Sequence, residues 1–154
     1  MAKLHRVEGQ IELKCEADKY FDVWAHKMYL IQKMCPDKVQ KPVLLEGAWN
    51  KVGALVSGNY VINEIGEKAS LKARMNEIDE KGMSVRYSYH DGFIMEKYYK
   101  SLTSKVQAIP KGKGCIVKWS FEYEKMKEDA PDANVYVDFM LAMSKDMGAY
   151  LCKA

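Results

Sequence analysis

The sequence lacks a long apolar run, and this absence excludes several classes of protein. No stretch approaches the ~18 consecutive apolar residues of a membrane-spanning helix. Residues 1–8 carry charge but no apolar segment, so we expect no secretory signal. Residues 152–154 are one residue too short for a prenylation box. We therefore expect a cytoplasmic protein without a membrane partner.

Clustered metal ligands are also missing. The four cysteines form no Cys-x-x-Cys pair, and the three histidines are distant from them in the sequence. A structural metal site needs grouped ligands, so we expect no metal and interpret the cysteines as reduced structural thiols. These residues are Cys15, Cys35, Cys115 and Cys152, with His5, His26 and His90.

A strong charge of one sign is absent as well. There are 24 basic and 21 acidic residues, a net charge of +3, and the lysines are scattered without any arginine-rich run. Nucleic-acid-binding domains concentrate positive charge on one face or in one run. The sequence therefore predicts no nucleic-acid partner.

The chain does have enough apolar residues for one sizeable core. Its 154 residues suit a single domain, residues 1–154, and 48% of them are hydrophobic. No internal repeat, low-complexity segment or Gly/Ser-rich linker divides the chain. A monomer is the default expectation, because no coiled-coil heptad occurs.

Periodicity predicts a strand over residues 4–15 and helical spacing over 17–34. Asp18 is a candidate cap for that helix and Pro36 ends it, so the stretch is one bent helix or two short ones. Six further strands are predicted over residues 37–46, 54–62, 68–79, 83–89, 98–109 and 117–124. A long helix follows Pro131. The short turns imply an α+β class, a curved antiparallel sheet packed against a long C-terminal helix.

The last third of the chain carries two apolar faces. One lies on an aromatic strand and the other on a methionine-rich helix, and the two either bury each other or line a cavity. Small residues elsewhere favour the cavity, because they leave space opposite long, adaptable methionines. The strand face is Val117, Trp119, Phe121 and Tyr123, the helix stripe is Tyr136, Met140, Met143, Met147 and Leu151, and the small residues are Gly58, Ala73, Ser104 and Gly148.

Several short segments are informative through their order and spacing. They are Met28-Tyr29-Leu30-Ile31 with Met34-Cys35-Pro36, Leu44-Leu45-Glu46-Gly47-Ala48-Trp49 with Val52-Gly53, Val117-Lys118-Trp119 with Glu122-Tyr123-Glu124-Lys125, Glu128-Asp129 and Ser144-Lys145-Asp146-Met147. On these segments the chain resembles the major latex protein and ripening-related branch of the plant pathogenesis-related class 10 (PR-10, Bet v 1-like, birch-pollen allergen) superfamily. The resemblance covers essentially the whole length.

This resemblance implies a helix-grip fold. In that fold a seven-stranded curved antiparallel sheet wraps a long C-terminal helix, two short N-terminal helices brace the helix, and a large internal cavity lies between them. It also implies binding of small hydrophobic plant molecules such as hormones, terpenoids, sterols, flavonoids or alkaloids, with roles in defence, development or specialised metabolism. No cofactor is implied, and biosynthetic enzymes of the same pathway are an optional partner.

The resemblance also carries over a set of residues that line the cavity, and the strand alternation described above assigns the same face. The ligand-binding set is Tyr60, Val85, Tyr87, Tyr89, Leu102, Ser104, Trp119, Phe121, Tyr136, Met140, Met143, Met147 and Leu151.

The chain departs from the superfamily at its glycine-rich loop, residues 46–53. The loop has two glycines and no Gly-Lys-Ser/Thr ending, which weakens the basis for cradling a phosphate. We interpret it as a structural turn that Trp49 covers.

Recognised catalytic motifs are absent: there is no Gly-x-Ser-x-Gly elbow and no His-Glu-x-x-His site. A polar group in an apolar hollow is the remaining source of chemistry. The candidates are Tyr87, Tyr89, His90 and Lys100, the last at the inward parity of its strand. Their structural alternatives are an exposed His90 at a strand end, a rim lysine, and tyrosines that only orient a ligand.

Three functions therefore remain open. The first is a carrier of a small hydrophobic metabolite, and the alternative is a cofactor-free cyclase or isomerase that acts on a reactive terpenoid or alkaloid intermediate in the same cavity. The third, a partner-binding module, needs an exposed apolar patch, which Trp49 and the turn Asp91-Gly92-Phe93 are placed to form.

Overall fold

The computed structural model describes residues 3–62, 67–92, 95 and 97–152. A seven-stranded sheet runs in the order β1-β7-β6-β5-β4-β3-β2, and every neighbouring pair is antiparallel. The strands are β1 (Leu4–Leu13), β2 (Val43–Glu46), β3 (Leu55–Ile62), β4 (Glu67–Asp79), β5 (Ser84–Gly92), β6 (Tyr99–Lys111) and β7 (Gly114–Lys125). The helical elements are α1 (Ala17–His26), η1 (Met28–Leu30), α2 (Ile31–Met34) and α4 (Asn134–Cys152).

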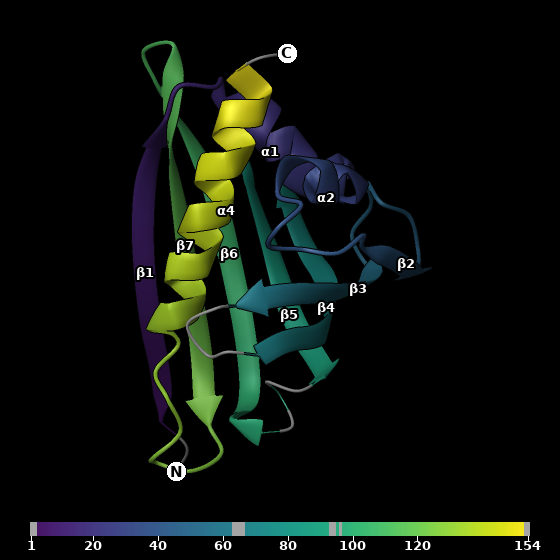
Figure 1. Ribbon diagram of the computed structural model, residues 1–154, viewed down its shortest axis with the longest axis vertical. Coiled ribbons are helices and arrows are strands. Elements are labelled where there is room, and N and C mark those ends of the chain that lie inside the picture. The colour runs from purple at the N-terminus through teal and green to yellow at the C-terminus, as the bar shows by residue number, and fades with distance from the viewer. Residues whose placement is uncertain (1–2, 63–66, 93–94, 96, 153–154) are drawn as a thin grey trace.

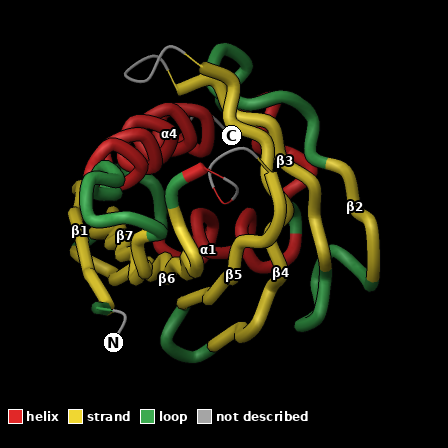
Figure 2. Tube along the Cα trace, turned by 90° about the horizontal axis from the view of Figure 1, so that it is seen from below, coloured by secondary structure: helices red, strands yellow, loops and turns green. Residues whose placement is uncertain are grey.

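The sheet wraps around α4. This helix lies lengthwise against β1 and β7, and α1 and α2 lie beside its C-terminal half (Figure 1). Seen end-on, the strands curl from β1 round to β3 with α1 and α4 on the inner side (Figure 2). The predicted α+β class and the helix-grip arrangement are thus confirmed.

The aromatic strand β7 buries the face that the sequence alternation predicts. In β7 the side chains of Val117, Trp119, Phe121 and Tyr123 are all buried, because they share the face that α1 and α4 cover. The same period of two organises β6 from Leu102 onward. The sheet therefore presents one continuous apolar inner face.

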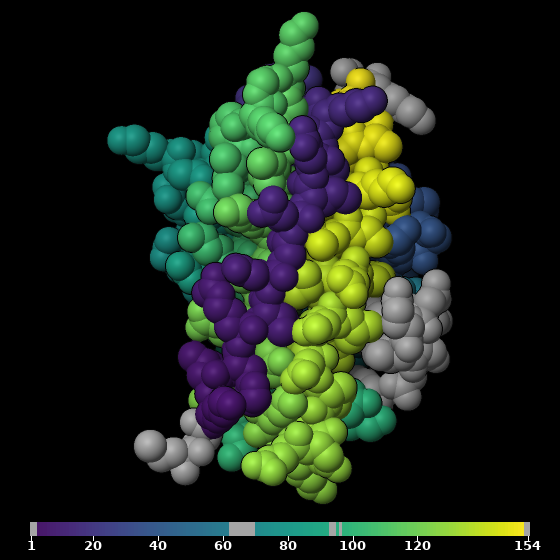
Figure 3. All heavy atoms as spheres, turned by 90° about the vertical axis from the view of Figure 1, so that its left-hand side faces the viewer, coloured from purple at the N-terminus to yellow at the C-terminus, as the bar shows by residue number. Residues whose placement is uncertain are grey.

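The strand β1 packs directly against α4, and Figure 3 shows the two side by side along the surface. Gly9 makes this approach close: a Cβ there would lie 2.9 Å from Val137 Cγ1 and 3.0 Å from Leu141 Cδ1. Gly148 on α4 likewise faces Leu13 rather than a hollow. Its small size therefore serves helix–sheet packing, which corrects the expectation that it borders a cavity.

Two local predictions are wrong. The strand predicted over residues 37–46 covers only Val43–Glu46 as β2, because Pro42 has no N–H to donate to a ladder; upstream of it, Val39 makes only an isolated bridge to Tyr60. The predicted cap Asp18 instead lies inside the first turn of α1, where its carboxylate accepts a hydrogen bond from the Lys19 backbone N–H. The region 17–34 is two helices separated by η1.

None of the helices in the described part of the chain is long and apolar enough to cross a lipid bilayer.

Candidate functional site

A cavity lies between the inner face of the sheet and α4, and α1 with η1 closes one side of it. Its walls come from β3, β4, β5, β6, β7 and the three helical elements just named. The lining residues are Trp24, Met28, Val56, Gly58, Tyr60, Leu71, Ala73, Tyr87, Tyr89, Leu102, Phe121, Tyr136, Phe139 and Met140. Every one of these is apolar or aromatic, so the cavity is built to exclude charge.

The cavity is narrower than the family resemblance implies. The space that the centre of a water molecule can occupy is about 50 Å³. Aromatic side chains account for this, because Tyr60 on β3 meets Phe139 on α4 edge-on, with ring centroids 5.9 Å apart. A ligand larger than a single small ring therefore requires side chains to move. Met28 and Met140 are suited to that movement, because methionine has several flexible torsions.

The structure brings seven of the thirteen predicted lining residues to this cavity. They are Tyr60, Tyr87, Tyr89, Leu102, Phe121, Tyr136 and Met140. The other six, Val85, Ser104, Trp119, Met143, Met147 and Leu151, do not border it. Contact of the seven with a ligand stays a prediction.

The expectation that Trp119, Met143 and Met147 face an open space is wrong. All three are fully buried, at 0% exposure, and none of them borders the cavity. The Trp24 and Trp119 rings meet in a T-shaped contact, with 5.2 Å between their centroids. The apolar interior is thus divided into a packed half beneath α1 and a hollow half toward β3 and β4.

A buried polar cluster fixes the packed half. The Tyr20 and Ser144 hydroxyls lie 2.7 Å apart, and Ser144 also donates to the Met140 carbonyl at 2.7 Å. Trp119 Nε1–H donates to Ser144 Oγ at 3.2 Å and to the Tyr20 hydroxyl at 3.3 Å. These bonds satisfy polar groups that burial would otherwise leave unpaired.

Sequence reasoning missed the contribution of α1. Trp24 and Met28 share a helical face with Tyr20, but their spacing does not tell which element or space that face meets. Phe139 was missed because the predicted apolar face of the C-terminal helix includes its neighbour Met140 and not Phe139 itself. The small residues Gly58 and Ala73, in contrast, were signals in the sequence that do mark this cavity.

Four tyrosines line the cavity and supply polar points: Tyr136 on α4, and three on β3 and β5. The Tyr87 hydroxyl donates to the Trp24 carbonyl at 2.7 Å, and the Tyr89 hydroxyl pairs with Ser104 Oγ at 2.6 Å. Burial raises the pKa of Tyr60 to about 12 and the pKa values of Tyr87 and Tyr89 well above 10. All three therefore remain neutral hydroxyls at physiological pH.

Two of the proton-transfer candidates lie away from the cavity. His90 is exposed on the outer face of β5, with Nε2 2.8 Å from Ser88 Oγ. Lys100 is exposed as well, because a register shift between Tyr99 and Ser101 inserts an extra residue and reverses the inward parity. Tyr99 takes the buried position instead, which corrects the inward placement of Lys100.

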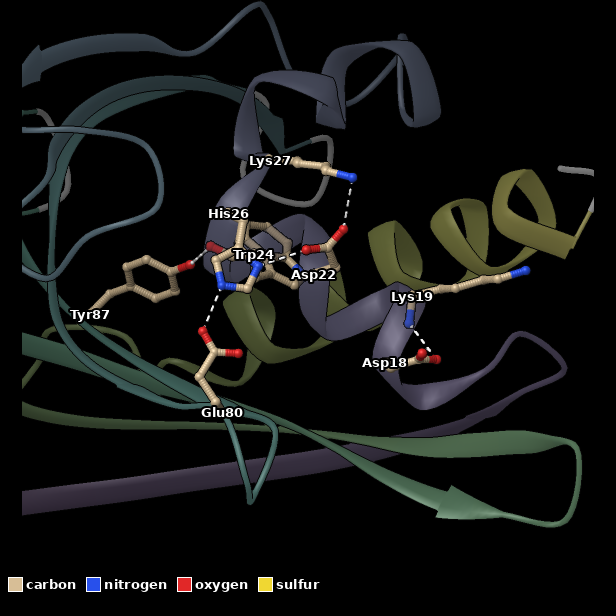
Figure 4. A network of polar contacts seen from close by, with 8 residues as sticks. All are labelled: Asp18, Lys19, Asp22, Trp24, His26, Lys27, Glu80 and Tyr87. Carbon is tan, nitrogen blue, oxygen red and sulfur yellow. Dashed lines mark hydrogen bonds and ion pairs between the residues drawn. The ribbon is translucent and has the colours of Figure 1, made fainter.

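An ion-pair network ties the end of α1 to the turn between β4 and β5 (Figure 4). His26 Nδ1 lies 2.6 Å from Asp22 Oδ1 and His26 Nε2 lies 2.7 Å from Glu80 Oε1, while Lys27 Nζ lies 3.0 Å from Asp22 Oδ2. Desolvation lowers the pKa of His26, but the hydrogen bonds to Asp22 and Glu80 outweigh it and raise the pKa above 6.5. The network holds α1 where Trp24 lines the cavity.

The loop of residues 46–53 is a self-contained turn. Two of its backbone N–H groups are engaged: Gly53 donates to the Met75 carbonyl at 2.8 Å and Lys51 donates to the Ala48 carbonyl at 3.2 Å. Both glycines adopt positive φ, 77° at Gly47 and 97° at Gly53.

Trp49 covers Tyr29, with ring centroids 5.5 Å apart, and does not reach the cavity. The turn Asp91-Gly92-Phe93 was the other segment expected to form an exposed apolar patch. The structure describes Asp91 and Gly92, and Phe93 lies outside the described residues. Among the residues that the structure describes, no group of three or more His, Cys, Asp or Glu side chains is placed to hold a metal ion.

The sequence is similar to those of a known protein family. The profile of the pathogenesis-related protein Bet v 1 family matches residues 2–154. The chain is 33% identical to MLP-like protein 34 of Arabidopsis thaliana over 94% of its own length, but spans only 46% of that relative. It is 32% identical to MLP-like protein 31 of the same plant, over 95% of this chain and 85% of the relative.

Solved structures share the whole architecture. Ginseng major latex-like protein 151 from Panax ginseng superposes with a TM-score of 0.90 at 29% identity, covering 96% of this chain and 97% of that one. Norcoclaurine synthase from Thalictrum flavum, solved with dopamine and hydroxybenzaldehyde, has a TM-score of 0.75 over 99% of this chain and 88% of its own. At 16% identity the second likeness concerns the fold alone.

Proposed function

The chain belongs to the pathogenesis-related protein Bet v 1 family, and from that premise we propose that it binds a small hydrophobic plant metabolite in its internal cavity. The observation that carries the proposal is the lining: among the described residues it is wholly apolar and aromatic, with tyrosine hydroxyls as its polar points. Ligand sites combine an apolar wall with a few placed polar groups in this way. The protein would act as a carrier or buffer of the bound molecule.

Binding would draw mainly on apolar burial. Removing apolar surface from water contributes about 25 cal/mol for each Å² buried, before the cost of ordering the ligand. Because the free cavity is narrow, part of that gain is spent on moving side chains such as Met28 and Met140. Ligands that fit with little rearrangement, or that are rigid, should therefore bind best.

The reducing cytoplasm is the location we propose. The four cysteines are all unpaired, and three of them are buried. Burial raises the pKa of Cys35 to about 12, so this thiol is held protonated and unreactive. Thiols of this kind persist where glutathione keeps the environment reducing.

Uptake of the neutral fluorescent probe N-phenyl-1-naphthylamine tests the proposal. The wild-type protein should enhance its fluorescence, and a terpenoid, sterol or flavonoid should displace it. Ala73→Phe places a ring in the cavity and should reduce the affinity at least about tenfold, because it removes space that the probe needs.

The matched control is Ala142→Phe, which adds the same ring at an exposed position of α4. It should leave probe binding unchanged, and thermal unfolding of both variants shows whether each remains folded. Equal probe binding by the wild type and folded Ala73→Phe would contradict a site in this cavity.

Catalysis is not proposed. The name norcoclaurine synthase belongs to the Thalictrum flavum protein, whose likeness to this chain is one of fold. Of the candidate groups, His90 and Lys100 are exposed outside the cavity, and the Tyr87 hydroxyl is committed to a backbone carbonyl. No observation in the described cavity favours a cyclase or isomerase over a binding protein.

A further inference from the structure

The three tyrosines that β3 and β5 contribute to the cavity lining differ in how their hydroxyls are satisfied. Tyr87 donates to the Trp24 carbonyl and Tyr89 pairs with Ser104. The hydroxyl of Tyr60 has no hydrogen-bond partner among the described residues, and burial alone raises its pKa. The Tyr60 donor is therefore available to a ligand.

The position of the Tyr60 ring is set by its own strand and by α4. Gly58, two residues earlier on β3, leaves the ring room to lie back over the strand: a Cβ at Gly58 would lie 2.9 Å from Tyr60 Cε2 and 3.2 Å from its hydroxyl oxygen. On its other side the ring meets the edge of Phe139. The hydroxyl is therefore held inside the cavity by a glycine cradle and an aromatic contact.

Charge is the second feature of the lining. None of the described lining residues is a lysine, arginine, histidine, aspartate or glutamate. A carboxylate brought into such a site loses its hydration and gains no counter-ion, which makes its burial costly. Hydrogen bonds from neutral hydroxyls, in contrast, suit an uncharged oxygen.

From this juxtaposition of an unpaired hydroxyl and an uncharged wall, we propose that the cavity selects neutral molecules with one oxygen acceptor, such as a carbonyl or ether, that accepts the hydrogen bond of Tyr60. The inference rests on the proposed function and adds the chemical class of the ligand. Tyr60 is a specificity-determining residue in this account, and Gly58 is the residue that positions it.

Matched small probes test this class directly. Acetophenone is a neutral ketone, cumene has nearly the same shape without an acceptor, and benzoate carries a charge. Their affinities for the wild-type protein and for Tyr60→Phe are measured by isothermal titration calorimetry at neutral pH. The ratio of acetophenone to cumene affinity is compared between the two proteins, because the difference in water solubility of the probes then cancels.

The ratio should fall by about three- to tenfold in Tyr60→Phe, since a single buried hydrogen bond to a neutral group is lost. Cumene affinity should be unchanged. Tyr150→Phe is the matched control and should leave the ratio as in the wild type, because it removes an exposed hydroxyl of α4 outside the cavity lining. Benzoate should bind the wild type at least about 100-fold more weakly than acetophenone.

Two results would overturn the inference while leaving the proposed function intact: an unchanged ratio in Tyr60→Phe with cumene still bound, or benzoate binding as tightly as acetophenone. Failure of the wild type to bind either neutral probe would instead remove the proposed function and this inference together.

Discussion

Single residues decide which half of the interior is packed and which is hollow. Ser144 sits at the centre of the packed half, where its hydroxyl contacts Tyr20, Trp119 and the Met140 carbonyl. It is 0% exposed, so its hydroxyl depends on these protein groups for its hydrogen bonds. A serine in the middle of an otherwise apolar helix face is therefore a structural feature of the core and not a ligand contact.

Replacing Ser144 with alanine should lower the free energy of unfolding by about 1–3 kcal/mol, because the substitution leaves Trp119 Nε1 and the Tyr20 hydroxyl with fewer partners in a buried site. Urea denaturation measures the loss. Ser70→Ala, at an exposed strand position, is the control and should change stability by less than about 0.5 kcal/mol. Equal effects of the two substitutions would argue against the buried cluster.

At the scale of elements, the contact between α1 and the β4–β5 turn decides the position of one cavity wall. His26 joins two carboxylates, and the hydrogen bonds it makes raise its pKa against the opposing effect of desolvation. A raised pKa means that the protonated ring stabilises the fold. This contribution is complete below the unfolded value of 6.5 and is lost as the pH rises through the folded pKa.

His26→Gln should therefore remove a pH dependence of stability. In the wild type the free energy of unfolding should decline between pH 6.5 and 8.5 by no more than about 1 kcal/mol, because the network is partly exposed. The variant should show a flatter profile in this window. A slope that survives in His26→Gln would contradict the assignment.

Individual strands and helices differ in how well the sequence predicts their buried faces. Alternation in residues 117–123 predicts the buried face of β7 because its period of two is unbroken. It fails at Lys100, where a bulge reverses the parity without any local signal. Periodicity also tells which face of α4 is buried, but not whether that face meets α1 or a cavity. Met140 and Met143 follow one stripe and yet have different surroundings.

At the scale of the whole molecule, the helix-grip fold is only partly filled. The sheet curls round both α4 and α1, which lie on its inner side (Figure 2). The lining residues place the cavity toward β3 and β4. The family resemblance supplied this architecture, whereas the small size of the cavity depends on how particular rings such as Tyr60 and Phe139 meet. Such side-chain packing cannot be deduced from periodicity.

The most direct test of the account is a methyl NMR titration with a neutral hydrophobic ligand. In protein labelled at the methionine methyl groups, Met28 and Met140 line the cavity, whereas Met143 and Met147 lie in the packed core. Saturating acetophenone should shift the Met28 and Met140 signals and leave those of Met143 and Met147 nearly in place. Equal shifts of all four signals, or none at Met28 and Met140, would contradict a ligand site between α4 and the sheet.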